Sequence, residues 1–169
     1  KIVENAPLQL MVSNISYNDY VGSLAIGRLR AGKIKVGDEV AVIQDQGKQK
    51  KLKVSALFQY HVNAQVPVLE IGAGDIAIVA GLEDFTIGDT ITDPLDPRPL
   101  TRIAVEEPTV GMVFIVNNGP FAGMDGKNVT SRKILERLEK ELLHNVAIRV
   151  EKTDSTDAFK VIGRGELQL

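Results

Sequence analysis

The chain has 169 residues, of which 44% are hydrophobic and 25% charged, and its formal net charge is −2. These values are typical of a globular protein large enough to bury a core, and they exclude a nucleic-acid binder that acts through bulk charge. The absence of cysteine excludes disulfides and thiolate metal sites, and no apolar run approaches the ~20 residues that cross a bilayer, so we expect no membrane partner.

The pattern over residues 8–91 predicts short strands separated by turns. Alternating apolar residues and glycine or asparagine turn signals place the strands at residues 8–17, within 22–43, and at 51–60, 66–71, 75–79 and 87–91. No helical period occurs in this part. Evenly spaced short strands with glycine at the corners indicate a closed antiparallel β-barrel.

Residues 22–43 contain the most distinctive strand pattern. We expect the following side chains to face the core: Leu24, Ile26, Ile34, Val36, Val40 and Val42. We expect the cations between them to point outward: Arg28, Arg30, Lys33 and Lys35. Residues 28–53 hold eight cations against three acids, whereas residues 69–107 hold nine acids against two arginines.

This charge distribution predicts a basic stripe on one face of adjacent strands, next to an acidic border. Cations in such a stripe release counterions when they contact phosphates. The aromatic residues do not alternate with the cations, so backbone contacts to folded RNA fit better than base stacking. A merely solvated sheet face is the alternative.

Residues 93–99 hold three of the seven prolines and mark a domain boundary. We therefore assign residues 1–93 to the barrel, 94–107 to a proline-rich linker and 108–169 to a second domain. In that domain the pattern predicts a buried strand at 109–116, a glycine-rich loop at 117–130, and strands at 146–150 and 158–162. It also predicts a helix at 131–144 that is capped by Thr130 or Ser131 and that Asn145 ends in the left-handed region.

Strand, helix, strand and strand form the first part of a split β-α-β, ferredoxin-like unit whose closing helix and strand are missing or cut short. The fold class is thus mainly β, a barrel followed by a truncated α+β unit. The first strand of that unit should have an uncovered edge, which favours self-association. Because the chain starts without methionine and ends as a helix begins, we expect it to be a fragment.

No catalytic, cofactor or metal site is predicted in this chain. The stretch from Gly119 to Lys127 lacks both the first glycine and the final Ser or Thr of a P-loop. The two histidines have no partner pattern for zinc or for a catalytic triad. An anion could still bind the free amides where the helix begins near Ser131, and Lys127 and Arg132 are the weaker candidates for phosphate contact.

Several quoted segments carry a family resemblance. GRLRAGKIKVGDEVAVI and AGDIAIVAGLEDFTIGDTI resemble the second-domain barrel of the translational GTPases. VNNGPFAGMDGKNVTSR is more specific and is similar to the third domain of the BipA/TypA family, which is related to elongation factor G. GRGELQL resembles the start of that domain's second helix, although the family usually has His where this chain has Gln168.

The resemblance implies a cytoplasmic, ribosome-associated parent that hydrolyses GTP. Its P-loop, switch and Asn-Lys-x-Asp motifs lie in an N-terminal domain and are absent from this sequence. The resemblance thus implies that GTP and magnesium bind elsewhere in the parent and that this segment is not an enzyme by itself. It also implies that the barrel faces the RNA of the small ribosomal subunit and that the third domain lies near the decoding-side protein surface of that subunit. A structural spacer that orients the flanking domains without contacting RNA is the alternative.

Overall fold

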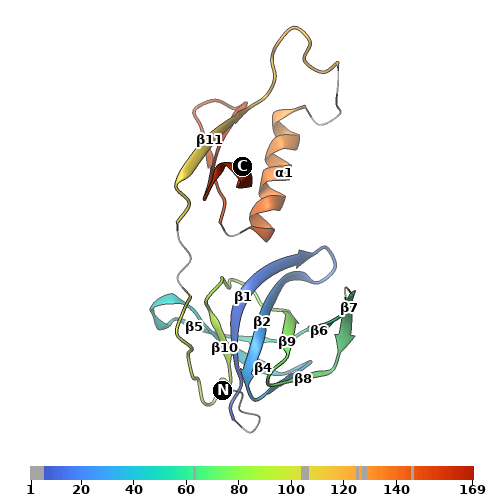
Figure 1. Ribbon diagram of the computed structural model, residues 1–169, viewed down its shortest axis with the longest axis vertical. Coiled ribbons are helices and arrows are strands. Elements are labelled where there is room, and N and C mark those ends of the chain that lie inside the picture. The colour runs from blue at the N-terminus through green and yellow to red at the C-terminus, as the bar shows by residue number, and fades with distance from the viewer. Residues whose placement is uncertain (1–5, 63, 104–106, 125, 127–128, 146) are drawn as a thin grey trace. The chain divides into compact units, whose positions relative to one another are not determined.

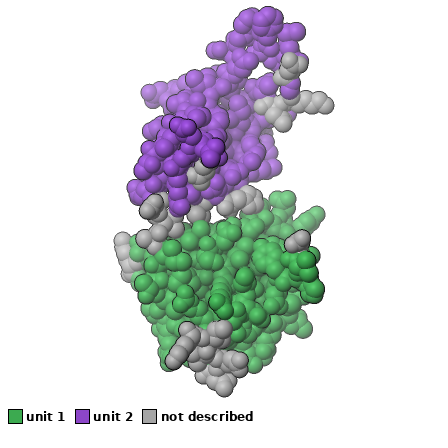
Figure 2. Space-filling model, in the orientation of Figure 1, with its two compact units in different colours: residues 1–105 green, residues 106–169 purple. Residues whose placement is uncertain are grey.

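A computed structural model describes residues 6–62, 64–103, 107–124, 126, 129–145 and 147–169 (Figure 1). The chain divides into two compact units, residues 1–105 and residues 106–169 (Figure 2). Within the described residues, no helix is long and apolar enough to span a membrane.

Unit 1 is built from antiparallel strands. They are β1 (Gln9–Asn18), β2 (Gly22–Ala31), β3 (Lys33–Lys35), β4 (Glu39–Ile43), β5 (Gln49–Lys53), β6 (Ala56–His61), β7 (Ala64–Val68), β8 (Glu70–Gly72), β9 (Ile76–Ala80) and β10 (Thr90–Thr92), with a 3-10 turn at Asp45–Gly47. Eight of them form one sheet in the order β5-β4-β10-β1-β2-β9-β6-β7, and β3 pairs with β8. The strand predicted at residues 66–71 is divided between β7 and β8.

The connection between β5 and β6 shows that the large sheet curls on itself. These strands are first and seventh in the sheet order, and only Val54 and Ser55 separate them in sequence. Flat strands six spacings apart would lie about 29 Å from each other, whereas three residue steps span about 11 Å at most. The Ser55 amide also donates to the Ala80 carbonyl of β9 at 2.9 Å. The predicted barrel is therefore confirmed.

The barrel core is aliphatic and closely packed. Its fully buried members include Leu10, Leu29, Val42 and Ile91. Gly27 lies where β2 crosses β1 closely, because a Cβ atom there would be 2.0 Å from the Met11 carbonyl oxygen. The close approach of the β1 and β2 backbones therefore requires a glycine at position 27.

Leu24 and Ile26 of β2 are buried as predicted, but they do not face the same core as the rest of the predicted set. Leu24 and Ile26 have the same strand parity as Arg28, so all three side chains leave the same side of β2. Ala25 and Leu29 fill the barrel core instead. Leu24 and Ile26 belong to a second apolar cluster, which also includes Val21, Ala56, Phe58, Ile78 and Ala80.

Val36 is also placed differently from the prediction. Its side chain is 39% exposed, because β3 ends at Lys35 and the chain turns at Gly37, where φ is +92°. The neighbouring predictions for Ile34, Val40 and Val42 are confirmed, since all three are buried in the barrel core.

The proline-rich segment lies against the barrel. The Leu100 and Arg98 amides donate to the side-chain oxygens of Thr90 and Thr92, both at 3.1 Å. The Gln9 side-chain amide donates to the Arg98 carbonyl at 2.9 Å. Residues 94–103 therefore belong to the compact first unit, and the limits of the native domains stay a prediction.

Unit 2 contains β11 (Val110–Ile115), α1 (Ser131–His144), β12 (Arg149–Lys152), β13 (Ala158–Gly163) and a final 3-10 turn at Glu166–Gln168. The sheet order is β11-β13-β12, and both outer strands are antiparallel to β13. Since β11 and β12 are therefore parallel and α1 connects them, this is a β-α-β crossover with a strand between its arms. The mainly β fold with a small α+β unit is confirmed, and its ferredoxin-like character stays a prediction.

The ends of α1 have identifiable causes. The Thr130 hydroxyl accepts a hydrogen bond from the Lys133 amide at 3.4 Å, as expected of an N-cap. Asn145 follows the helix in an extended conformation with φ of −122°, so the predicted left-handed ending is wrong. The Asn145 side chain accepts a bond from the Ala147 amide at 3.2 Å, and this turn delays the next strand until Arg149.

Candidate nucleic-acid interface

The β2–β3 cation cluster consists of Arg28, Arg30, Lys33 and Lys35, and all four side chains are exposed. Between them, Leu29 and Ile34 are fully buried in the barrel core. The alternation of core and surface residues therefore fixes the direction in which these cations point.

Arg30 lies at an irregularity in the strand pairing. Gln9 pairs with Ala31 and Leu10 pairs with Leu29, so β2 has one residue more than β1 at this point. Such a bulge redirects a side chain and increases the local twist of a strand. Arg30 makes no ion pair with any carboxylate in the described part of the chain.

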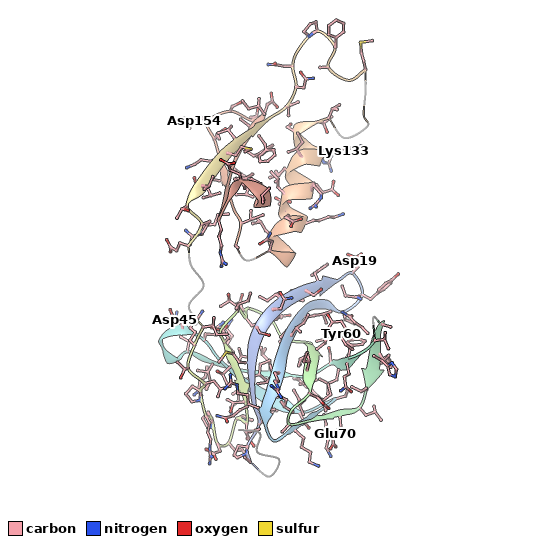
Figure 3. The ribbon with its side chains drawn as sticks, viewed as in Figure 1. Asp19, Asp45, Tyr60, Glu70, Lys133 and Asp154 are labelled. Atoms are coloured by element: carbon pink, nitrogen blue, oxygen red, sulfur yellow. The ribbon has the colours of Figure 1, made fainter. Side chains whose placement is uncertain are left out.

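The other members of the cluster contact a single segment that begins at β8. Lys33 Nζ and Lys35 Nζ lie 3.2 and 3.0 Å from the two carboxylate oxygens of Glu70. Glu70 is the first residue of β8 in unit 1 (Figure 3). Arg28 Nε donates to the Gly74 carbonyl at 3.0 Å. One carboxylate thus faces two lysines, and the cluster keeps a surplus of positive charge.

The Glu70 contacts alter the protonation of their partners. Hydrogen bonds from Lys35 and Lys33 lower the pKa of the Glu70 carboxyl below its ordinary value. The hydrogen bond to Glu70 and its charge raise the pKa of the Lys35 ammonium. Both groups are therefore charged at neutral pH. The Lys35 side chain is 54% exposed and the Glu70 side chain 41%, so water and salt screen the pair strongly.

The predicted single stripe is wrong. The cations of β5 lie on a strand that β4, β10 and β1 separate from β2 in the sheet. Lys50 makes an ion pair with Asp84. Lys51 lines a cavity of about 470 Å³ together with Lys33 and three acids, Asp38, Glu39 and Asp93. The cations of β5 therefore do not continue those of β2 along neighbouring strands, although Lys51 and Lys33 line the same cavity.

The acidic border folds back onto the basic segment. Glu70 pairs with two lysines, Asp84 pairs with Lys50, and Arg102 lies 3.8 Å from Asp45. These partners are 34 to 57 residues apart in sequence, so a local charge count could not detect them. The available signal was the opposite sign of the two segments, which favours their pairing across the barrel.

Asp89 is a functional-looking acid that the sequence did not single out. Its side chain is buried, Oδ2 accepts a bond from the Thr86 amide at 2.8 Å, and Oδ1 lies 3.1 Å from Arg102. Burial raises the pKa of the Asp89 carboxyl, while the Thr86 bond and the Arg102 charge oppose that change. Because the contacts attach residues 100–103 to the barrel, we assign Asp89 a structural role.

In unit 2, Arg132 lies in the first turn of α1 and lines a cavity of about 370 Å³. Lys152 of β12 and the hydroxyl-bearing residues of the loop 153–156 share this cavity, together with Asp154. Arg132 therefore has a second cation beside it, which sequence reasoning did not identify. Lys127 lies outside the described residues.

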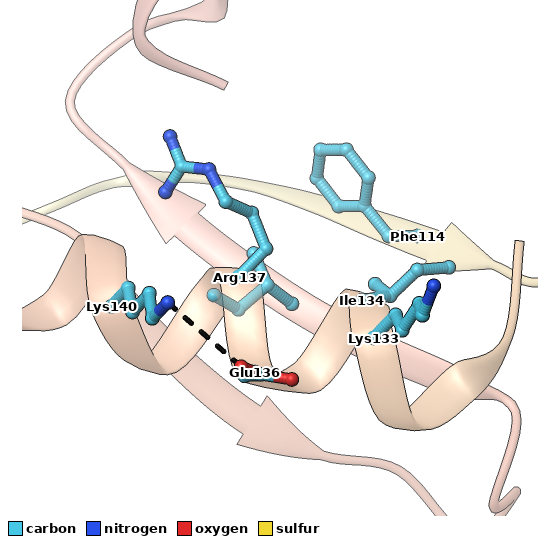
Figure 4. Close-up of a pocket in the computed structure, with 7 residues that line it drawn as sticks. Phe114, Lys133, Ile134, Glu136, Arg137 and Lys140 are labelled. Carbon is cyan, nitrogen blue, oxygen red and sulfur yellow. Dashed lines mark ion pairs between the residues drawn. The ribbon is translucent and has the colours of Figure 1, made fainter. Parts of the chain in front are cut away.

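A second cavity of unit 2 lies between α1 and β11 and measures about 520 Å³ (Figure 4). Phe114, Ile134 and Leu138 supply its apolar lining. Charged residues of α1 surround it, and they form ion pairs along the helix: Lys140 with Glu136 at 3.8 Å and Arg137 with Glu141 at 2.8 Å. This cavity offers apolar contact and no catalytic group.

No group of three or more metal-ligating side chains occurs among the residues that the structure describes. Asp19, which begins an Asp-x-x-Gly sequence, lies in the turn between β1 and β2. There the Tyr20 amide donates to the Asn18 side chain at 2.9 Å and Gly22 has φ of +77°. That sequence is therefore a turn between two paired strands.

Comparison with known proteins identifies relatives of the whole chain. The family model described as Elongation factor Tu domain 2 matches residues 22–92, which include most of the barrel. Proteins named "Large ribosomal subunit assembly factor BipA" are similar over nearly the full chain. The identity is 47% with that of Salmonella typhimurium over 98% of the chain, 47% with that of Bacillus subtilis over 99%, and 46% with that of Haemophilus influenzae over 100%.

The alignment includes nearly all of this chain but only a small part of each relative. The aligned segment makes up 27% of the Salmonella and Haemophilus proteins and 28% of the Bacillus protein. The chain thus spans about a quarter of the length of the curated relatives it matches.

Proposed function

Because this chain belongs to the BipA/TypA family of translational GTPases, we propose that it is a ribosome-docking segment whose barrel contacts ribosomal RNA. The β2–β3 cation cluster makes the phosphate contacts, and unit 2 couples ribosome binding to the GTPase domain of the parent protein. The observation that carries the proposal is the surplus of positive charge in that cluster, where Glu70 pairs with Lys33 and Lys35 while Arg28 contacts a backbone carbonyl and Arg30 makes no ion pair among the described residues.

The environment of the cluster supports phosphate binding. The two lysines are held by exposed, screened ion pairs, so a phosphate can replace Glu70 at small cost. Arg28 is oriented by a backbone carbonyl and Arg30 by a bulge, and neither contact neutralises the guanidinium charge. Phosphate contacts of this kind give affinity without sequence specificity.

The ribosomal subunit is a separate question. The family resemblance implies the small subunit, whereas the names of the relatives refer to assembly of the large subunit. The chemistry proposed for the cluster requires only clustered backbone phosphates, which both subunits offer. We therefore propose ribosomal RNA as the partner, in the cytoplasm, and test the two subunits in parallel.

GTP hydrolysis is assigned to another domain of the parent. The sequence of this chain has no P-loop and no Asn-Lys-x-Asp motif. In the proposal, GTP and magnesium bind outside this segment, and this segment contributes affinity for the ribosome.

The test measures binding of the 169-residue chain to purified small and large subunits over a range of salt concentrations. Replacement of Arg28 and Arg30 by Ala should weaken binding and reduce the slope of log K against log salt by roughly 1–2. The matched control replaces Lys51 and Lys53 by Ala, which removes the same charge from β5. Equal loss in both double variants, or no salt dependence at all, would overturn the proposal.

A structural spacer is the second candidate, and the ion pairs favour it. Lys33, Lys35 and Lys50 all contact carboxylates of the same molecule, which leaves fewer cations for RNA. In this case the parent protein with Arg28→Ala and Arg30→Ala keeps its ribosome affinity and its ribosome-stimulated GTPase rate. Insertion of flexible residues between the two units, in the segment from Ile103 to Glu107, should then impair both.

A further inference from the structure

One side of β10 is buried although it faces away from the barrel core. Ile91 fills the core, so the side chains of Thr90 and Thr92 leave the opposite side of the strand. These two threonines are nevertheless only 2% and 0% exposed. Their cross-strand partners in β4, Ile43 and Ala41, lie on the same side and are also buried. A further layer of chain must therefore cover this side of the barrel.

Residues 94–103, which we call the strap, provide this layer beside β10 (Figure 1). The Leu100 amide donates to the hydroxyl oxygen of Thr90, and the Arg98 amide donates to that of Thr92, both at 3.1 Å. The strap lies within the described chain and forms no helix or strand there. Its backbone donors are thus satisfied by side chains of the barrel rather than by a ladder of backbone bonds.

The barrel also has a seat for the end of the strap. The Arg102 guanidinium lies 3.1 Å from the buried carboxylate of Asp89 and 3.8 Å from that of Asp45. Gly88 has φ of +93° and leaves room for this contact, because a Cβ atom there would be 2.8 Å from both Arg102 Cγ and the Ile103 carbonyl oxygen. The last residues of the strap therefore have a specific position on the barrel.

The strap buries little apolar surface of its own. Eight of its ten residues are exposed, including Leu95 at 91% and Ile103 at 47%. Three others, Pro94, Pro97 and Pro99, have no amide hydrogen to donate. A segment held by a few polar contacts opens at a lower free energy than a strand whose side chains fill a core. The strap should therefore detach while the strands of the barrel stay paired.

We propose that the strap is a releasable tether whose two states give the two units a short or a long connection. When it is docked, four residue steps separate Ile103 from Glu107, which pairs with Arg149 in unit 2, and they span about 14 Å at most. When it is released, fifteen steps from Thr92 to Glu107 span up to about 50 Å. The prolines keep the released strap extended and stiff.

Native-state hydrogen exchange of the 169-residue chain at several low urea concentrations tests the release. We expect the Leu100 and Arg98 amides to exchange faster than the Leu29 amide, which donates to the Asp75 carbonyl in the barrel. Exchange of the two strap amides should also depend much less on urea, because release exposes less surface than unfolding. If Leu100 and Leu29 exchange with the same protection and the same urea dependence, the strap opens only with the barrel and the proposal is overturned.

A substitution at the seat tests the role of its ion pair. Arg102→Met should accelerate exchange of the Leu100 amide at least tenfold, because it removes the charged partner of Asp89. Arg98→Met is the matched control, since it makes the same change in a pair with Asp96 that lies wholly within the strap. Equal acceleration in both variants would contradict the seat.

Distances between the units test the consequence of release. The chain has no cysteine, so spin labels can be attached at Tyr20→Cys in unit 1 and Thr156→Cys in unit 2, both exposed positions. Double electron–electron resonance should show more of the longest distances in Arg102→Met than in the wild type, and Arg98→Met should leave the distribution unchanged. An unchanged distribution in Arg102→Met would overturn the tether.

Discussion

Units 1 and 2 use their apolar residues differently. Of the 27 buried apolar residues in the described chain, 23 belong to unit 1, and only Ile148, Ala158, Phe159 and Val161 belong to unit 2. Unit 1 curls its sheet until apolar side chains fill its interior. Unit 2 has three strands and one helix, and its outer strand β11 keeps apolar residues exposed.

This difference shows what a strand pattern specifies in each unit. In the barrel, a buried position is enclosed by neighbours from several strands, so a substitution there affects many contacts. In unit 2, four of the six residues of β11 are exposed although the strand is entirely apolar apart from Gly111, so the same pattern does not produce an enclosed core. The stability of unit 1 should therefore depend on close packing, and the stability of unit 2 should depend more on its helix.

The two units can be followed separately by spectroscopy. All three tyrosines, Tyr17, Tyr20 and Tyr60, belong to unit 1. The only α-helix in the described residues, α1, belongs to unit 2. Tyrosine fluorescence therefore reports unfolding of the barrel, and ellipticity at the helix band is dominated by unit 2.

The largest effect is expected from Gly27→Ala. The added methyl carbon would meet the Met11 carbonyl oxygen at 2.0 Å, so β1 and β2 must separate. We expect a loss of about 3 kcal/mol in the free energy of unfolding of unit 1, measured by urea denaturation with tyrosine fluorescence. Helix ellipticity should keep its midpoint, and a matching shift in that signal would show that the units unfold together.

Gly72→Ala is the matched control for this substitution. Its added carbon would have no heavy atom within 4 Å, and the backbone there is not left-handed. An equal loss of stability in both variants would mean that glycine flexibility, rather than the close approach of two strands, explains Gly27.

The next effect concerns the ion pair between Arg102 and the buried Asp89. Arg102→Met leaves the carboxylate without its charged partner, which should cost about 1–3 kcal/mol at pH 7. Arg98→Met makes the same change in an exposed pair with Asp96 and should have a much smaller effect. Both are measured by the tyrosine transition, and equal losses would contradict the importance of burial.

The pH dependence of this pair follows from the raised pKa of Asp89. A carboxyl whose pKa is higher in the folded state favours folding below its ordinary pKa, and that contribution is lost as the pH rises through the raised value. Asp89→Asn should remove this part of the pH dependence from the unfolding curve of unit 1. The loss in free energy of unfolding caused by Arg102→Met should be smaller at acidic pH, where Asp89 is protonated, than at pH 7.

A smaller effect is expected at the start of α1. Thr130→Ala removes the hydroxyl that accepts from the Lys133 amide, and the loss should be about 0.5–1 kcal/mol because the bond is long. Helix ellipticity in a thermal scan measures it, and the tyrosine transition should not move. Thr156→Ala, at an exposed loop position of the same unit, is the control, and an equal shift there would contradict the capping role.

The elements themselves could be predicted because their causes are local. Alternation located β1, β2, β4 and β9, and helical spacing with a threonine cap located α1. The grouping of the cations could not be predicted. The register that places Lys35 opposite Glu70 joins two strands 35 residues apart, and no short-range pattern contains it. The orientation of β2 required only correct strand parity, which places Leu24, Ile26 and Arg28 on one side.

The smallest effect on stability is expected from Glu70→Gln, and it sharpens the comparison most directly. The variant removes the charge that pairs with Lys33 and Lys35 at exposed positions, so the tyrosine transition at neutral pH should not shift measurably. The pKa of the Lys35 ammonium should fall towards its ordinary value in an NMR titration, because Glu70 is the main cause of its increase.

Glu70→Gln should strengthen RNA binding, although it should leave the stability of unit 1 unchanged. Two lysines released from a carboxylate raise the positive charge of the β2–β3 cation cluster, so the chain should bind ribosomal RNA more tightly and with a steeper salt dependence. In the wild type, RNA binding should strengthen in the same way only when the pH falls below the lowered pKa of Glu70, where its carboxyl becomes protonated and loses its charge. If Glu70→Gln binds ribosomal RNA no differently from the wild type, the RNA contact lies outside the β2–β3 cation cluster. The known difference between the barrel and unit 2 would then be the more complete enclosure of the barrel core.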